Sequence, residues 1–118
     1  MAIVYVVDDY PGLASAVAGA LRSAGYETKA FRGGLRVLEA LQEKVKPDVI
    51  VTDLNMPGMT GIQLAAQVRE RCSNVWLILM SSERLSAEEL LEHGFAGQCT
   101  KGQLSDDLEN LIASLLSG

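Results

Sequence analysis

Short, mainly apolar runs alternate along the whole chain with segments in which apolar residues recur every three or four positions. This alternation predicts an α/β domain with a parallel sheet, because strands and helices that follow one another in turn pack as repeated units. The predicted strands span residues 3–7, 28–31, 49–52, 76–80 and 98–100. The runs at 3–7, 49–52 and 76–80 are almost wholly apolar, as strands covered on both faces are, so we place them at the centre of the sheet.

Spacing and end residues predict a helix after each strand. Apolar stripes mark the first, second and last helices: Leu13, Val17, Ala20 and Leu21; Leu35, Leu38 and Leu41; and Leu108, Leu111, Ile112, Leu115 and Leu116. Pro11 suits the first position of the first helix, and the pair Gly33-Gly34 predicts a turn before the second. Ser105 is the expected cap of the last helix, with Asp106 and Asp107 in its first turn.

The third and fourth helices have recognisable ends. Thr60 with Gln63, and Ser86 with Glu89, have the spacing of a capping box, in which two side chains satisfy the free N–H groups at a helix start. Gly94 suits the end of the fourth helix, where a left-handed residue is common. No repeat or linker interrupts the order of elements.

Composition limits the class of protein. The 118 residues fit one compact domain, residues 1–118, with no second domain, and the content of 48% hydrophobic and 21% charged residues is that of an ordinary globular protein. Cys72 and Cys99 lack metal or redox spacing, so we expect two free thiols and a reducing cytoplasm. With no signal peptide or membrane span in the pattern, we expect a soluble, cytoplasmic protein. The net charge of −5, without a basic stripe, favours protein partners over DNA or RNA.

Polar residues gather where the predicted strands end. They are Asp8, Asp9, Asp53, Ser81, Ser82 and Lys101. Each alone is more often a cap, a turn residue or a solvated charge, but the carboxyl ends of parallel strands meet at one edge, where ligands bind. Three converging carboxylates repel one another unless a cation is bound, and hard oxygen ligands suit Mg²⁺. Such an ion and Lys101 could neutralise a phosphoryl group accepted by an aspartate.

Other phosphate-binding sequences are absent, since the chain has neither a Walker loop nor a dinucleotide fingerprint. The residues instead resemble a family over the whole chain. Val6-Val7-Asp8-Asp9, the run from Asp53 to Gly61 (DLNMPGMTG), Ser81-Ser82 and Thr100-Lys101 resemble the receiver domain of response regulators in two-component systems, of the chemotaxis-regulator type. The run from Asp53 to Gly61 is the most specific of these motifs.

The resemblance implies a flavodoxin-like, doubly wound sheet of five parallel strands in the order 2-1-3-4-5, with five helices. It implies that Asp53 is phosphorylated from a sensor histidine kinase or a histidine phosphotransfer protein. Mg²⁺ would be held by Asp9, Asp53 and the backbone carbonyl of Asn55, with Asp8 acting through water. Ser81, Ser82 and Lys101 would bind the phosphoryl oxygens. The protein would then be no enzyme beyond catalysing its own phosphorylation and dephosphorylation.

Two positions depart from the family pattern. A proline usually follows the lysine of the last strand through a cis peptide bond, but here Gly102 follows Lys101, so we expect a trans bond and a looser connection. The aromatic switch residue three positions before that lysine is replaced by Gln98. Burying an amide without partners costs about 1–3 kcal/mol, so we expect Gln98 to stay near solvent and switching to depend on residues 81–86.

Two other functions fit parts of the pattern. A pseudo-receiver, which docks to proteins without being phosphorylated, has the same fold, but here Asp8, Asp9, Asp53, Ser81 and Lys101 are all present. A haloacid-dehalogenase-like phosphatase also uses a strand-end aspartate, but it needs an acidic residue two positions later, where this chain has Asn55. The downstream partner is a protein target or an output domain outside this chain, which is either a stand-alone regulator or part of a longer protein.

Overall fold

The computed structural model describes residues 1–101 and 105–117. Strands and helices alternate in the order β1 (Ile3–Val7), α1 (Pro11–Ser23), β2 (Glu27–Phe31), α2 (Gly34–Ala40), β3 (Val49–Thr52), α3 (Gly61–Arg71), β4 (Trp76–Ser81), α4 (Ala87–His93), β5 (Gly97–Thr100) and α5 (Ser105–Ser117). The strands form a parallel sheet in the order β2-β1-β3-β4-β5. The expected fold and strand order are therefore confirmed, and each predicted strand matches an observed one to within a residue at either end.

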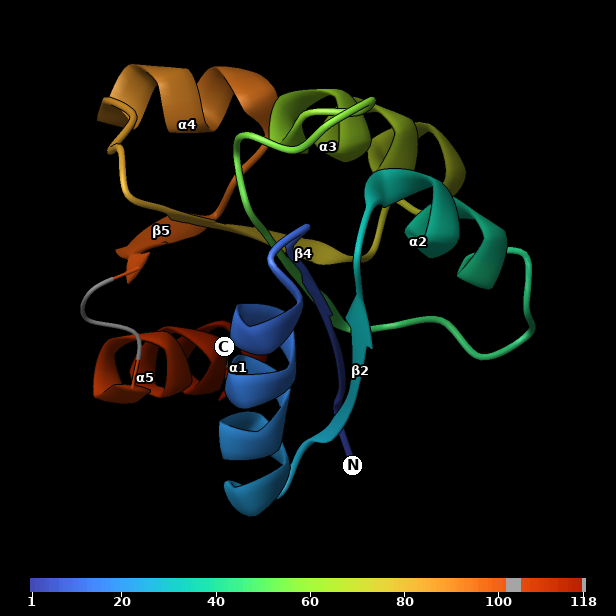
Figure 1. The fold of residues 1–118 in the computed structure, drawn as a ribbon, viewed down its shortest axis with the longest axis vertical. Helices are drawn as coiled ribbons and strands as arrows, with labels where there is room; N and C mark the ends of the chain where they lie inside the picture. Colours follow the sequence, from blue (N-terminus) through green and yellow to red (C-terminus); the bar gives the residue numbers. More distant parts are fainter. Residues whose placement is uncertain (102–104, 118) are drawn as a thin grey trace.

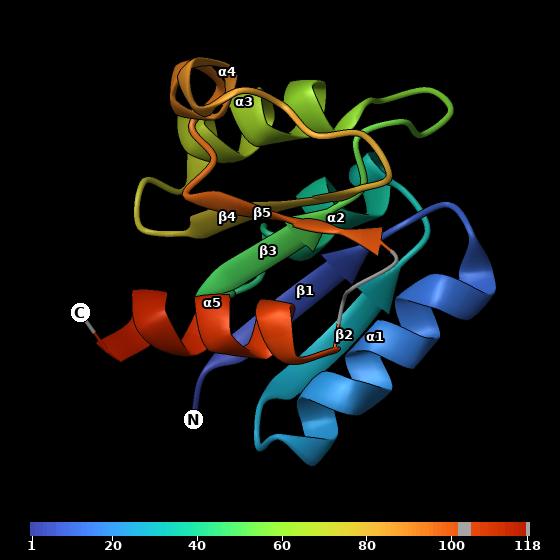
Figure 2. The same cartoon turned by 90° about the vertical axis from the view of Figure 1, so that its left-hand side faces the viewer.

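Helices cover both faces of the sheet. Helices α1 and α5 lie on one face, and α2, α3 and α4 lie on the other (Figures 1 and 2). Successive residues of the central strands point to opposite faces of the sheet. Val4 and Val6 of β1 pack toward α1 and α5, while Tyr5 and Val7 pack toward α2 and α3. Strands β1, β3 and β4 are buried along almost their whole length, which confirms their place at the centre.

Most of the predicted helix signals hold. Pro11 begins α1, both capping boxes form, and Gly94 ends α4 in the left-handed conformation with φ of 81°. Two residues of the predicted stripes are exposed, however. Ala20 lies on the solvent side of α1, and Leu35 is 68% exposed, because α2 turns Val37 rather than Leu35 toward the sheet.

The remaining predictions on this scaffold have mixed outcomes. Cys72 and Cys99 are both free thiols, as expected, and Cys99 is buried. Asp106 and Asp107 lie in the first turn of α5, whereas the side chain of Ser105 and the peptide bond to Gly102 lie outside the described residues. Within residues 1–101 and 105–117, no helix has both the length and the apolar character that a membrane span requires.

Candidate functional site

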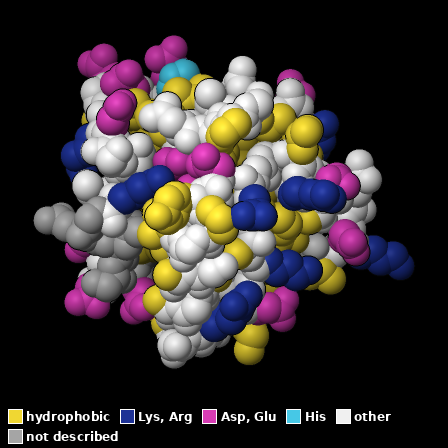
Figure 3. Space-filling view, in the orientation of Figure 1, with side chains coloured by type: hydrophobic (Ala, Val, Ile, Leu, Met, Phe, Trp, Pro, Cys, Tyr) yellow, Lys and Arg dark blue, Asp and Glu magenta, His cyan; other side chains and the backbone are white. Residues whose placement is uncertain are grey.

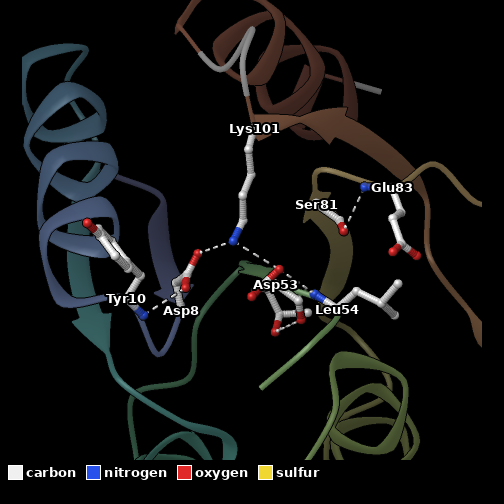
Figure 4. A network of polar contacts seen from close by, with 8 residues as sticks. Asp8, Tyr10, Asp53, Leu54, Ser81, Glu83 and Lys101 are labelled. Atoms are coloured by element: carbon white, nitrogen blue, oxygen red, sulfur yellow. Dashed lines mark hydrogen bonds and ion pairs between the residues drawn. The ribbon is translucent and has the colours of Figure 1, made fainter. Parts of the chain in front are cut away.

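Parallel pairing brings the predicted polar residues to one edge of the sheet. Asp8 follows β1, Asp53 follows β3, Ser81 ends β4 and Lys101 follows β5. Backbone hydrogen bonds extend the sheet pairing to both acidic residues: the Asp8 N–H donates to the Phe31 carbonyl at 3.0 Å, and the Asp53 N–H donates to the Val7 carbonyl at 2.9 Å. The sheet therefore fixes the backbone of both residues, and their side chains lie close together on either side of the Lys101 ammonium (Figure 4).

Three carboxylates meet at this edge. Asp8, Asp9 and Asp53 each offer one oxygen to a group whose atoms all lie within 4.8 Å of one another. Asp8 is fully buried and Asp53 is 5% exposed, whereas Asp9 is exposed to solvent. In the space-filling view, acidic side chains lie near the centre of the face shown, with Lys and Arg side chains to either side (Figure 3). The predicted cluster thus forms, with one member open to an incoming ligand.

Lys101 connects the two buried carboxylates. Its Nζ lies 2.9 Å from Asp8 Oδ2 and 3.1 Å from Asp53 Oδ1 (Figure 4). The other contacts are backbone N–H groups: Tyr10 donates to Asp8 Oδ1 at 2.9 Å, and Leu54 donates to Asp53 Oδ1 at 2.8 Å. Asp8 Oδ2 has no other polar partner among the described residues. A single ammonium therefore holds two carboxylates that would otherwise repel each other in a poorly solvated place.

The charges of the cluster do not balance. Burial raises the pKa of the Asp53 carboxyl; the hydrogen bond from Lys101 opposes this rise, and the nearby Asp8 charge adds to it. Burial by itself lowers the pKa of Lys101, but its bonds to Asp8 and Asp53 outweigh burial and leave that pKa raised. Lys101 is thus firmly protonated at neutral pH, and one positive charge faces three carboxylates.

The donor set fits a hard divalent cation. All three side chains offer carboxylate oxygens, the atoms that Mg²⁺ prefers, and the surplus negative charge is what such an ion would neutralise. The buried Asp8 Oδ2, which has no hydrogen-bond partner among the described residues besides its contact with the Lys101 ammonium, belongs to one of these three carboxylates. Asn55 follows in the same connection with an exposed side chain. The residues present therefore fit the expected magnesium site.

The connection after Asp53, residues 53–60, is the β3–α3 loop. It folds tightly back on the acceptor: Leu54 and Met56 are buried, and the Gly61 N–H donates to the Leu54 carbonyl at 2.8 Å. A Cβ on Gly61 would lie 2.2 Å from the Asp53 carbonyl oxygen, closer than any real contact. Gly58 takes a positive φ of 82°. These constraints explain why the run from Asp53 to Gly61 carries glycines at those two positions.

The connection after β4, residues 82–86, is the β4–α4 loop. Ser81 is buried, and its Oγ accepts a hydrogen bond from the Glu83 N–H at 3.2 Å, while Ser82 is exposed (Figure 4). Both serines thus lie at the edge that carries Asp53, because β4 is the neighbour of β3. The hydroxyl is engaged with its own loop rather than with the carboxylate cluster.

Gln98 was expected near solvent because its amide would lack partners inside the protein, and this reason is wrong. The side chain is half-buried, and its amide makes two hydrogen bonds to Leu85: Oε1 accepts from the Leu85 N–H at 2.9 Å, and Nε2 donates to the Leu85 carbonyl at 2.8 Å. The penalty for burying an unpartnered amide does not apply, because the loop backbone supplies both partners. The pattern of the sequence held no signal for this contact, which depends on where the loop lies.

Comparison with known proteins shows which proteins this chain resembles. Residues 4–113 match the family model described as the response regulator receiver domain. The response regulator ORR5 of rice (Oryza sativa) is 32% identical over 117 residues, which cover 96% of this chain and 87% of ORR5. The DNA-binding transcriptional regulator NtrC of Escherichia coli is 40% identical over 80 residues, which cover 68% of this chain but only 17% of NtrC.

Solved structures give the same result. The response regulator TrrA from Thermotoga maritima, crystallised in complex with Mg²⁺-BeF, is 25% identical with a TM-score of 0.82, and the match covers 98% of this chain and 99% of TrrA. The chemotaxis response regulator CheY4 of Vibrio cholerae is 30% identical with a TM-score of 0.82 over 99% of this chain and 98% of CheY4. The chain belongs to the family of receiver domains of two-component response regulators.

Proposed function

We propose that Asp53 accepts a phosphoryl group from a phosphohistidine on a sensor histidine kinase or a histidine phosphotransfer protein. The observation that carries the proposal is the placement of Asp53, whose Oδ1 lies 3.1 Å from the Lys101 ammonium beside two further carboxylates. In the transfer, an Asp53 oxygen forms a bond to phosphorus as the bond from phosphorus to the histidine nitrogen breaks. The leaving imidazole nitrogen keeps the electron pair and takes up a proton.

The neighbouring side chains have distinct roles in this proposal. Lys101 binds one oxygen of the phosphoryl group, since its ammonium already touches the acceptor. The Ser81 hydroxyl and the Ser82 N–H bind two others after the β4–α4 loop adjusts. These groups stabilise charge where the transfer develops it, which is the main contribution a protein makes to phosphoryl transfer.

The acidic residues hold the metal ion. Asp9, Asp53 and the Asn55 backbone carbonyl would bind Mg²⁺ directly, with Asp8 acting through water. When bound, the ion supplies positive charge that offsets both the carboxylates and the incoming phosphoryl oxygens. Asp8 also holds Lys101 in place, because its buried Oδ2 contacts the ammonium at 2.9 Å.

We expect Mg²⁺ to bind the unphosphorylated protein weakly, because a partly hydrated ion gains its full set of ligands only when phosphate is present. Asp9→Ala should weaken binding most, since Asp9 is the exposed and most accessible carboxylate of the cluster. Titration followed by magnetic resonance measures the affinity. Equal affinities of the wild type and Asp9→Ala would show that the metal site lies elsewhere.

The proposed function implies signalling rather than turnover of an outside substrate. The chain would catalyse only its own phosphorylation and dephosphorylation and would change its contacts with a downstream protein or output domain. The chain spans only 17% of the length of NtrC. Any activity or partner of a longer protein that contains this domain is therefore also a proposal.

Intact-mass spectrometry after incubation with acetyl phosphate and Mg²⁺ tests the acceptor. We expect one added phosphoryl group on the wild type, none on Asp53→Asn, and unchanged labelling of Asp106→Asn, which removes an exposed carboxylate outside the site. Full labelling of Asp53→Asn would overturn the assignment. A wild-type protein that takes no label from acetyl phosphate or from a phosphohistidine donor would instead support the pseudo-receiver alternative.

A further inference from the structure

The side chain of Gln98 holds the β4–α4 loop by its backbone. Gln98 lies in β5, paired with Leu79 of β4, and its amide binds both the N–H and the carbonyl of Leu85 at 2.9 and 2.8 Å. Only one orientation of the amide satisfies both partners, because the oxygen must face the donor and the nitrogen must face the acceptor. We call this pair of hydrogen bonds the Gln98–Leu85 clamp.

Leu85 also packs against the core with its half-buried side chain, but few other polar contacts fix this loop. Among residues 1–101 and 105–117, residues 82–85 make no backbone-to-backbone hydrogen bond. The Glu83 N–H donates a hydrogen bond to the Ser81 hydroxyl, and the Arg84 guanidinium donates a long hydrogen bond of 3.4 Å to the Thr100 hydroxyl of β5. A single side chain therefore supplies the two shortest contacts that tie the middle of the loop to the sheet.

The clamp also sets where α4 begins. Ser86, the N-cap of α4, directly follows Leu85, and no residue of α4 is buried. Of the residues of α4, only the half-buried Leu90 packs against the core, so the position of the helix depends more on the residues that lead into it than that of a well-packed helix does. The clamp thus lies between Ser81, at the candidate phosphoryl site, and the start of an exposed helix.

We propose that Gln98 is a positioning residue that keeps the β4–α4 loop in its unphosphorylated arrangement and thereby weakens binding of the phosphoryl group. This inference rests on the proposed role of Ser81 and Ser82 at that group. The Ser81 hydroxyl is bonded to Glu83 within the loop, so turning it to the phosphoryl oxygen shifts a segment that the clamp holds two residues further on. Hydrogen bonds made in only one of two states favour that state.

The first arm of the test measures the clamp alone. In Gln98→Met, which keeps the length of the side chain but removes both polar atoms, the Leu85 amide should exchange at least about threefold faster, because its acceptor is gone. Gln98→Glu keeps the acceptor and loses the donor, so its effect should be intermediate. Gln67→Met on α3 is the matched control, since the Gln67 side chain accepts a hydrogen bond from Arg71 of the same helix and has no other side-chain hydrogen bond within residues 1–101 and 105–117. Unchanged exchange of Leu85 in Gln98→Met would overturn the inference.

The second arm measures coupling to the phosphoryl site, using beryllofluoride with Mg²⁺ as the probe. The half-saturating beryllofluoride concentration should fall roughly threefold to tenfold in Gln98→Met, with the same final occupancy, and should not change in Gln67→Met. A loss of Leu85 protection with an unchanged or raised half-saturating concentration overturns the inference but leaves phosphorylation of Asp53 intact. A wild-type protein that neither binds beryllofluoride nor takes label from acetyl phosphate overturns both.

Discussion

The β3–α3 and β4–α4 loops both border the acceptor, yet they are held in different ways. The β3–α3 loop, residues 53–60, is fixed by its own backbone, by the burial of Leu54 and Met56, and by the close approach of Gly61 to Asp53. It leads into α3, four of whose residues are buried. The β4–α4 loop, residues 82–86, is held by hydrogen bonds from the side chains of Ser81 and Gln98 and by the half-buried Leu85, and it leads into a helix with no buried residue.

We infer that the two loops have different functions. An acceptor must stay where the donor can reach it, and the rigid loop keeps Asp53 at a fixed position against β1. Signalling requires that part of the structure changes its position, and the segments that move are the less stable parts of a fold. The β4–α4 loop is of that kind, since side-chain hydrogen bonds and the packing of the half-buried Leu85 hold it, without backbone-to-backbone bonds of residues 82–85. The predictions below test this contrast, from the largest expected effect to the smallest.

The largest effect is expected from Gly61→Ala. The new Cβ would lie 2.2 Å from the Asp53 carbonyl oxygen, a backbone atom that cannot move without displacing the acceptor. We expect the free energy of unfolding to fall by at least about 2 kcal/mol, as for other overpacked sites. Gly19→Ala in α1 is the control, because its Cβ would meet nothing within 4 Å. Urea unfolding should show that the control is stabilised by about 0.5–1 kcal/mol. A harmless Gly61→Ala would mean that the β3–α3 loop is not rigid.

Asp53→Asn should make the protein more stable at neutral pH. Burial raises the pKa of the Asp53 carboxyl, so the folded state holds its proton more tightly than the unfolded state does. The ionised carboxylate therefore reduces the free energy of unfolding above its folded pKa, and this penalty disappears as the pH falls toward its unfolded pKa of about 3.9. We expect a gain in the free energy of unfolding at pH 7 that shrinks with acid or with added Mg²⁺.

The control for Asp53→Asn is Asp106→Asn, which removes a charge from the first turn of α5, where acidic residues are favourable. It should change stability slightly and in the opposite direction. Thermal unfolding from pH 4 to pH 8 measures both variants. A stability gain from Asp53→Asn that stays constant across this range would contradict the assigned cause.

The two capping boxes allow a matched comparison of the loops. Thr60→Ala removes the cap of the packed helix α3 and should cost about 1 kcal/mol of global stability. Ser86→Ala removes the equivalent cap of α4, but this helix is exposed, so we expect local fraying with little change in the global unfolding midpoint. Urea unfolding and amide exchange of the α4 first turn together separate these results. Equal global losses would show that α4 is as firmly packed as α3.

The smallest effect is expected from acid on α4. The Ser86 N–H and side chain lower the pKa of Glu89, so its ionised form supports the cap at neutral pH. This support is present above the unfolded pKa of about 4.3 and is lost as the pH falls through the lower folded pKa. The amides of the α4 first turn should then exchange faster, whereas those of α3, capped by the uncharged Gln63, should not. Magnetic resonance below the unfolded pKa of about 4.3, with exchange rates corrected for their intrinsic pH dependence, can detect the difference.

The sequence predicted the rigid parts of the molecule better than the adjustable ones. The strands, both capping boxes and the cluster of Asp8, Asp53 and Lys101 follow from local patterns and from the rule that parallel strand ends meet at one edge. These features depend on spacing along the chain. The contact between Lys101 and both carboxylates needed the structure, because it depends on how far a flexible side chain reaches.

The wrong predictions have a common physical cause. Gln98 was expected near solvent because its partner, the backbone of Leu85, lies 13 residues away in a loop whose course no pattern specifies. Leu35 was expected in the core because its spacing with Leu38 and Leu41 fits a helical stripe, yet the short α2 turns Val37 inward and leaves Leu35 exposed. In both cases the outcome depends on how a segment docks, which the local sequence does not determine.

Amide exchange with and without beryllofluoride, in the presence of Mg²⁺, tests most directly whether a fixed loop carries the acceptor while a loosely held loop responds to it. We predict that protection changes in residues 82–86 and in the first turn of α4, with the Leu85 amide among those affected. Residues 54–60 should keep their protection. Changes centred on residues 54–60 and α3, with residues 82–86 unaltered, would contradict this division.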